Sequence, residues 1–308
     1  MPADRIPRRR LLRLTGVALA GAAIAAWPRR PPSVTWTGQA MGGPAQVTLH
    51  GVEEATARRL VAQVAGLVDR MEGLFSLHRP DSVISRLNRQ GELGDPPAAF
   101  TDLLSRALSV SAATGGAFDP TVQPLWQLYR DQGAGADPAS VLDHVGWHGV
   151  LVGRDRVRLP PGACLTLNGI AQGYITDRVV DLLAAQGVGH MLVDMGEPRG
   201  VGRRDDGGDW MLGVADPDDA ARLITTLPVS GRAIATSAPR ASLADAAGRI
   251  GHIFDPATGR PAQGWKQVSV AAGTALLADA LSTAVAALPR DRAGAVLAGT
   301  GGALVAGV

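Results

Sequence analysis

Residues 274–288 carry an isolated carboxylate in an apolar stretch. Between Leu276 and Leu288 the only charged residue is Asp279, and Thr283 follows four positions later, so both oxygen-bearing side chains lie on one face of a predicted helix. An ionised carboxylate on so apolar a helix needs a partner or a metal. Oxygen ligands with few other charges suit Mg²⁺, which shares its shell with water and substrate phosphates. The same spacing also fits an Asp that caps or pairs with a neighbouring element.

Residues 251–259 predict a short apolar strand that ends in a turn favoured by Asp, Pro and Gly. His252 in this segment could accept a proton near neutral pH. Asp255 could orient that imidazole or hold the turn. Taken alone, the segment leaves a purely structural role for His252 open.

Two further segments place small residues where a ligand could approach the backbone. Residues 114–122 run from a helix end into Phe118 and Asp119, and residues 167–174 lead through Gly169 into a predicted helix. Neither a G-x-x-x-x-G-K-[ST] loop nor a strand-flanked G-x-G-x-x-G is present. Any nucleotide site must therefore be built differently.

The elements that must position these residues follow from hydrophobic periodicity and from Pro and Gly punctuation. Strands over 34–36 and 46–49 flank a turn at 41–44, and most other strands come late in the chain. The predicted helices span about 53–76, 97–115, 172–187 and 274–288, and the later strands lie near 190–194, 210–215, 223–229, 232–236, 250–254 and 266–272. This order predicts an α+β protein with a largely antiparallel sheet.

Composition indicates a globular protein with a basic leader. The 308 residues are 46% hydrophobic and 19% charged, with a formal net charge of +2. Residues 1–30 contain seven arginines and one acid, which leaves 23 basic and 27 acidic side chains in the rest of the chain, a net charge of about −4. A mildly acidic body argues against a nucleic-acid partner, because such a surface needs a concentrated positive field.

The leader has the three parts of an export signal: arginines, an apolar stretch over 14–26 and small residues before a cleavage point. Arg8 and Arg9 resemble the twin-arginine export pattern, although an ordinary secretory signal in an arginine-rich protein is the alternative. Cys164 is the only cysteine, so no intramolecular disulfide can form and no lipid-anchor cysteine follows the leader. We expect a signal peptide over 1–30, one domain over 34–308 and a soluble periplasmic location.

Several segments, in this order, resemble the ApbE-type FAD:protein FMN transferase family, also known under the older label of thiamine biosynthesis lipoproteins. The resemblance covers about residues 36–290. The segments that carry it are Met41 with Gly42, 79–88, 115–122, 169–174, 193–196, 235–237, 252–259 and 277–284.

The resemblance implies an ApbE-like α+β fold with flanking helices that binds FAD between its core and its loops. It implies Mg²⁺ bound by the side chains of Asp279 and Thr283 and by the carbonyl of Gly169, with His252 and Asp255 at the catalytic position. The flavin or adenosine contacts that it implies are Met41, His78, Ala117, Phe118, Asp119, Thr166, Gln172 and Ile253.

This sequence departs from the family pattern at several of these positions. His78 stands where an aromatic residue is usual, and Thr166 and Gln172 replace a usual aspartate and a usual lysine or other long polar residue. Glu197 with Pro198 interrupts the usual second glycine after Gly196, and residues 238–239 replace a usual Gly-Asp pair. The changes fall in the expected ligand pocket.

The reaction that the resemblance implies moves FMN from FAD to a Thr or Ser hydroxyl of an exported or membrane redox protein and releases AMP. Contact with a membrane is then expected only through that acceptor. Two alternatives use the same residues: an FAD pyrophosphatase that yields FMN and AMP, and a non-catalytic periplasmic flavin-binding protein.

Overall fold

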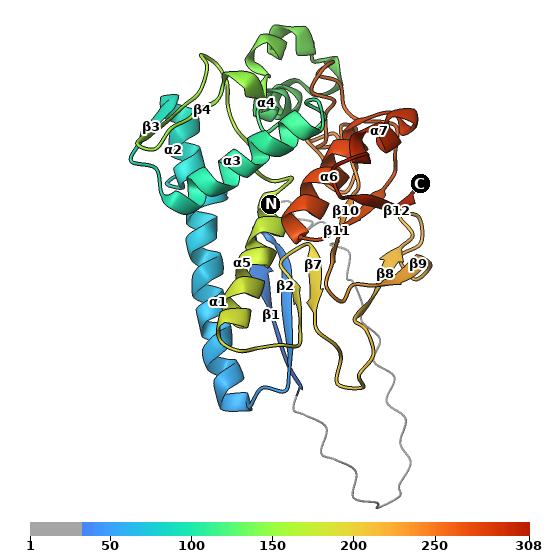
Figure 1. Ribbon diagram of the computed structural model, residues 1–308. Helices are drawn as coiled ribbons and strands as arrows, with labels where there is room; N and C mark the ends of the chain where they lie inside the picture. Colours follow the sequence, from blue (N-terminus) through green and yellow to red (C-terminus); the bar gives the residue numbers. More distant parts are fainter. Residues whose placement is uncertain (1–32) are drawn as a thin grey trace, which may run out of the picture.

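The computed structural model describes residues 33–308, so the predicted signal peptide over 1–30 lies outside the described residues. Within that range the main element is a seven-stranded antiparallel sheet with the order β1-β2-β6-β7-β10-β11-β12 (Figure 1). The strands are β1 (Ser33–Ala40), β2 (Gly43–His50), β6 (Met191–Asp194), β7 (Pro198–Val201), β10 (Ala233–Ser237), β11 (Val268–Ala272) and β12 (Ala303–Gly307).

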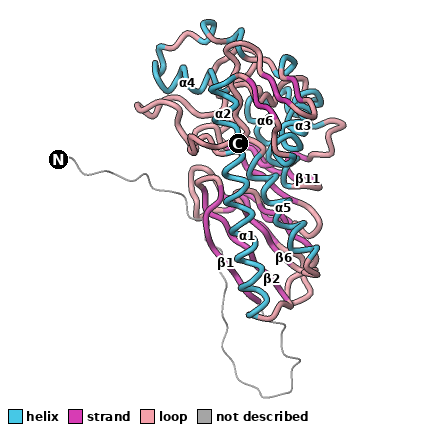
Figure 2. The backbone as a smooth tube through the Cα atoms, turned by 90° about the vertical axis from the view of Figure 1, so that its left-hand side faces the viewer, coloured by secondary structure: helices cyan, strands magenta, loops and turns pink. Residues whose placement is uncertain are grey.

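Two helices run along one face of the sheet. Figure 2 shows α1 (Glu54–Phe75) and α5 (Ala171–Ala185) lying over β1, β2 and β6. In α1 the buried side chains recur at helical spacing, which gives this long helix one apolar face. A third helix, α6 (Ala275–Ala287), packs against α5, β10 and β11.

A helical layer covers one end of the sheet (Figure 1). It contains α2 (Val83–Gln90), α3 (Ala98–Ala113) and α4 (Gln123–Gln132), together with a small sheet of β3 (Glu92–Gly94), β5 (Arg156–Arg158) and β4 (Leu151–Val152). Ser82 is the N-cap of α2, because its Oγ accepts a hydrogen bond from the Ser85 N–H at 3.2 Å.

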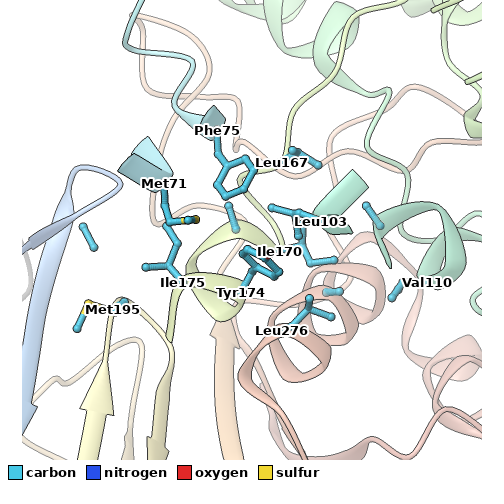
Figure 3. Close-up of a cluster of buried hydrophobic side chains, with 14 of the residues drawn as sticks. Met71, Phe75, Leu103, Val110, Leu167, Ile170, Tyr174, Ile175, Met195 and Leu276 are labelled. Carbon is cyan, nitrogen blue, oxygen red and sulfur yellow. The ribbon is translucent and has the colours of Figure 1, made fainter. Parts of the chain in front are cut away.

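The core between these layers fixes the start of α5. Figure 3 shows that four side chains converge there: Phe75, Leu103, Ile170 and Tyr174. The Phe75 and Tyr174 rings pack edge to face, with their centroids 5.8 Å apart. The Tyr174 hydroxyl donates to Asp102 at 3.0 Å, and burial together with this bond raises the pKa of Tyr174 to about 12. Full burial of each large side chain stabilises the fold by about 1.5–3 kcal/mol.

The opposite face of the sheet is covered by the hairpin β8 (Met211–Ala215) and β9 (Leu223–Pro228). Leu192, Trp210 and Ile234 form a second core there, and Trp210 Nε1 donates to the Val201 carbonyl at 3.0 Å. After α6 the chain turns at Pro289, forms α7 (Ala293–Leu297) and ends in β12.

The expected α+β fold is confirmed, and the four expected helices correspond to α1, α3, α5 and α6. The strand expected over 250–254 is wrong: this segment forms only isolated bridges, Leu243↔Gly251 and Phe254↔Pro261. The His252 N–H donates to the Pro239 carbonyl instead of continuing a ladder. Across residues 33–308, every helix is too short or too polar to cross a membrane.

Candidate active site

The carboxylate of Asp279 lies buried between α5 and α6, with 4% of the residue exposed. Its Oδ2 accepts a hydrogen bond from the Gly173 N–H at 3.0 Å. A side chain at Gly173 would overlap the Ala275 carbonyl, so glycine is required for this close approach of the two helices. Burial raises the pKa of Asp279 to about 7, the charge of Asp177 adds to this effect, and the bond from Gly173 opposes it.

Asp177 is the second buried carboxylate nearby, and both of its oxygens form contacts that stabilise the fold. Its Oδ1 accepts from the Ala275 N–H and its Oδ2 from the Leu276 N–H, each at 3.0 Å, which satisfies the first amides of α6. Arg199 pairs with Oδ1 at 2.5 Å. Asp177 therefore caps a helix from another element, a role that its position inside α5 did not predict.

Hydroxyl and carbonyl oxygens gather one turn further along α6. Thr283 Oγ1 lies 3.5 Å from the carbonyl oxygen of Gly169. Ser237, at the end of β10, places its Oγ 2.8 Å from Ser282 Oγ and 3.4 Å from Thr283 Oγ1. Ser237 was not predicted as a site residue, because nothing in the spacing of a strand end links it to Thr283, 46 residues later.

The chemistry of these donors fits a hard divalent cation. Across the part of the chain that the structure describes, no group of three or more His, Cys, Asp or Glu side chains could hold a metal ion. A cation bound here would take one carboxylate, Asp279, together with neutral oxygens of Thr283 and Gly169 and with ligand phosphates, which is a set that suits Mg²⁺. A cation would also offset the cost of ionising Asp279 in its buried position.

Glu197 adds a further acid at this site. Its Oε2 accepts from the Thr236 N–H at 3.2 Å, and its backbone carbonyl accepts from Thr176 Oγ1 at 2.9 Å. Burial and the charges of Asp279 and Asp194 raise the pKa of Glu197 well above its usual range. Glu197, which interrupts the expected glycine pair, thus places a carboxyl group close enough to Asp279 for their charges to interact.

Gln172 joins three segments at the start of α5. Its amide lies against Gly196, where φ is +116° and any side chain would overlap that amide. A Cβ at Gly43 would lie 3.2 Å from Gln172 Nε2. The turn of Met41, the start of α5 and the β6–β7 turn therefore meet at one place.

Asp119 and Thr166 each form hydrogen bonds with the loop at residues 120–121. Asp119 Oδ1 accepts from the N–H and Oγ1 of Thr121 at 2.8 and 2.6 Å, and Oδ2 accepts from the Trp147 N–H at 3.1 Å. The Thr166 N–H donates to the Pro120 carbonyl at 2.8 Å. Burial raises the pKa of Asp119, and Ala117 and Phe118 before it are buried in the core. Both oxygens of Asp119 hold the loop.

His252 is oriented by two backbone carbonyls. Its Nδ1 lies 3.1 Å from the oxygen of Pro239 and 3.1 Å from that of Ser242, so Nδ1 carries the proton and Nε2 the lone pair. Burial lowers the pKa of His252, which favours the neutral ring with its lone pair on Nε2. Ile253 beside it is buried in the main core.

Among the described residues, two expected site residues form hydrogen bonds only within their own loops. Asp255 holds its own turn, with Oδ1 accepting from the Ala257 N–H and Oδ2 from Thr258 Oγ1, both at 3.0 Å, and within residues 33–308 it makes no hydrogen bond to His252. His78 is exposed between α1 and α2, where its N–H donates to Ser76 Oγ at 3.2 Å.

Comparison with known proteins agrees with this fold and site. The model of the ApbE family matches residues 41–305. An FAD:protein FMN transferase of Klebsiella pneumoniae (strain 342) is 29% identical over 298 residues, covering 90% of this chain and 85% of the relative. An FAD:protein FMN transferase of Treponema pallidum (strain Nichols) is 31% identical over 276 residues, covering 79% and 75% of the two chains.

Solved structures of the same kind superpose on the fold. The apo flavinyl transferase ApbE of Pseudomonas stutzeri aligns with a TM-score of 0.76 and 25% identity over 89% of this chain and 92% of that one. The ApbE protein of Thermotoga maritima aligns with a TM-score of 0.78 and 27% identity over 89% and 93%. The chain belongs to the ApbE family. The expected class of enzyme, an FAD:protein FMN transferase, is confirmed.

Proposed function

We propose that this protein uses Mg²⁺ to transfer the FMN half of FAD to a Thr or Ser hydroxyl of an exported or membrane redox protein, with release of AMP. The observation that carries the proposal is the convergence of Asp279, Thr283 and the Gly169 carbonyl on one side of the α5–α6 contact. These residues would hold the cation. When bound, the cation neutralises charge on the pyrophosphate of FAD.

The proposed reaction is one displacement at the FMN-side phosphorus. The acceptor hydroxyl oxygen forms a new phosphoester bond, the bond between that phosphorus and the bridging oxygen breaks, and AMP leaves with that oxygen. His252 Nε2 takes the hydroxyl proton, because Nδ1 is committed to the carbonyls of Pro239 and Ser242. This assignment uses a neutral imidazole, which the lowered pKa of His252 favours.

The residues that depart from the family pattern still fit an FAD site, but with different polar groups around the ligand. Gln172 presents an amide between Gly43 and Gly196, where the family pattern has a lysine or another long polar residue. An amide can bond to a phosphate or a ring carbonyl without adding charge. Glu197 brings an additional acid close to Asp279, and in its ionised form this acid would attract a cation.

One incubation tests the proposal. Purified protein, FAD and Mg²⁺ are mixed with a candidate acceptor, and the products are measured by mass spectrometry. An FMN-sized mass addition on a Thr or Ser of the acceptor, with AMP in equal amount, is the expected result. Free FMN with AMP would establish a pyrophosphatase instead, and intact FAD bound to the protein would establish a carrier.

For the location we propose the periplasm, reached through the arginine-rich leader.

A further inference from the structure

The turn between β1 and β2 has an unusual backbone. Ala40 pairs with Gly43, so only Met41 and Gly42 form the turn. Their φ angles are +50° and +78°, and both residues therefore adopt the left-handed conformation of a tight hairpin turn. Glycine adopts this conformation freely, whereas the side chain of methionine disfavours it. A contact from outside the turn would offset the cost of about 1–2 kcal/mol for Met41 in this conformation.

Glu72 of α1 supplies that contact. Its Oε1 accepts a hydrogen bond from the Met41 N–H at 2.8 Å. The second oxygen, Oε2, pairs with Arg79 at 2.5 Å, and Arg79 also pairs with Asp69 at 2.9 Å. A charged acceptor fixed by a guanidinium makes a strong hydrogen bond to a backbone amide.

The two partners of Arg79 differ in their surroundings. The side chain of Glu72 is 19% exposed, whereas that of Asp69 is 72% exposed. An ion pair in open solvent contributes little to stability. A small open cavity of about 140 Å³ also borders Glu72, so water can fill the space of a shortened side chain there. The core of α1 therefore does not depend on the Glu72 carboxylate.

The turn that Glu72 holds lies next to the start of α5. Gly43 follows the turn directly and lies against the amide of Gln172. The next residue, Gly173, donates to Asp279. A shift of the Met41 turn would be passed to the start of α5 through the contact between Gly43 and Gln172.

We propose that Glu72, fixed by Arg79, is a positioning residue that holds the Met41–Gly42 turn in the shape that FAD binding requires. This inference rests on the proposed function for its ligand, FAD. Glu72 acts through the Met41 amide and the turn, and it takes no part in the displacement at phosphorus.

Three variants test the inference: Glu72→Ala removes the acceptor, Glu72→Gln keeps an oxygen for the Met41 N–H, and Asp69→Asn removes only the exposed partner of Arg79. We expect Glu72→Ala to raise the Kd for FAD, measured by calorimetry, and the KM for FAD by about tenfold, with little change in kcat at saturating FAD. Glu72→Gln should restore most of the affinity, and Asp69→Asn should match the unmodified protein.

Amide hydrogen exchange gives a readout that does not depend on FAD. Exchange in the segment 36–46 should accelerate by about tenfold or more in Glu72→Ala and by much less in Glu72→Gln, while exchange in α3, which packs on other elements, stays the same. Unchanged FAD affinity in Glu72→Ala would overturn the inference, and so would unchanged exchange.

Two further results keep the test decisive. Should Glu72→Ala fail to fold, Arg79→Met replaces it, because Arg79→Met removes the ion pair that fixes Glu72 while leaving the Glu72 carboxylate in place. Arg79→Met must then weaken FAD binding by about threefold or more, or the inference is wrong. Should the unmodified protein itself fail to bind FAD, the proposed function fails, and the exchange measurement alone decides whether Glu72 holds the turn.

Discussion

The N–H of Gly173 donates a hydrogen bond to Asp279 Oδ2 at 3.0 Å and so joins the start of α5 to the buried face of α6. Asp177 also connects these helices, but it uses both oxygens on the Ala275 and Leu276 amides and pairs with Arg199. Among the described residues Asp279 Oδ1 accepts no hydrogen bond. Removal of the charge is therefore expected to have different effects on activity and stability at the two carboxylates.

Replacing Asp279 by Asn should abolish magnesium-dependent flavin transfer while the fold survives. The amide keeps the size and can still accept from Gly173, but it lacks the charge that would hold a cation. Thermal melts with and without Mg²⁺ and the transfer assay check this. The melting temperature without Mg²⁺ should stay the same or rise, because a buried uncompensated carboxylate is removed.

Asp177→Asn is the matched control for that experiment. This change leaves Arg199 without its partner and weakens the cap of α6, at a cost of about 3 kcal/mol in the free energy of unfolding. An early melt for Asp177→Asn and a normal melt for Asp279→Asn would separate a structural carboxylate from a metal ligand. Transfer by Asp279→Asn at the original rate and with the original magnesium dependence would falsify the ligand assignment.

Replacing Gly169 by Ala should weaken Mg²⁺ binding by about tenfold without unfolding the protein. An added Cβ would lie 2.9 Å from Thr283 Oγ1, so the Thr283 side chain must move away from the Gly169 carbonyl. Calorimetric titration of Mg²⁺ in the presence of FAD measures the change. Gly73→Ala in α1 is the control, because a Cβ there meets nothing within 4 Å. It should raise stability by about 0.5–1 kcal/mol and leave the titration unchanged.

The long elements could be predicted because each carries its own periodic signal. The stripe in α1 and the apolar run of α6 identify both helices, and the predicted ends lie within a residue or two of the observed ones. The strand expected over 250–254 was wrong because a short apolar run also fits a loop that packs against the core. The isolated bridges at Gly251 and Phe254 make it such a loop.

From residue spacing alone, the candidate site was predictable only where its residues share an element. Asp279 and Thr283 lie on one helix, so their spacing placed them together. Ser237, Asp177 and Glu72 reach the site or support it from other elements, through contacts that join residues 31 to 99 positions apart. Such contacts depend on how helices and sheet pack, and single residue types in strands or helix interiors give no sign of them.

The leader provides a prediction about export. Changing Arg8 and Arg9 together to Lys should stop export if the twin-arginine route is used, because that route requires the arginine pair and not only its charge. The measurement is the amount of protein in the periplasmic and cytoplasmic fractions. A single change of Arg29 to Lys is the control, since it lies behind the apolar stretch. Normal export of the double variant would indicate the general secretory route.

His252→Asn should lower transfer by about 100-fold or more and should also make the stability of the protein less dependent on pH. Burial holds the pKa of His252 below its value of about 6.5 in the unfolded chain. Its contribution to stability is therefore present above about pH 6.5 and is lost as the pH falls through the folded pKa, because the unfolded chain takes up the proton first. Asn can still donate to the Pro239 carbonyl but does not titrate, so its melting temperature should fall less between about pH 7 and pH 5 than that of the unmodified protein. Melts across that range, with transfer measured at pH 7, test both effects. Equal pH dependence in the two proteins would mean that the ring is not held neutral by burial, and unchanged transfer would remove His252 from the proposed reaction.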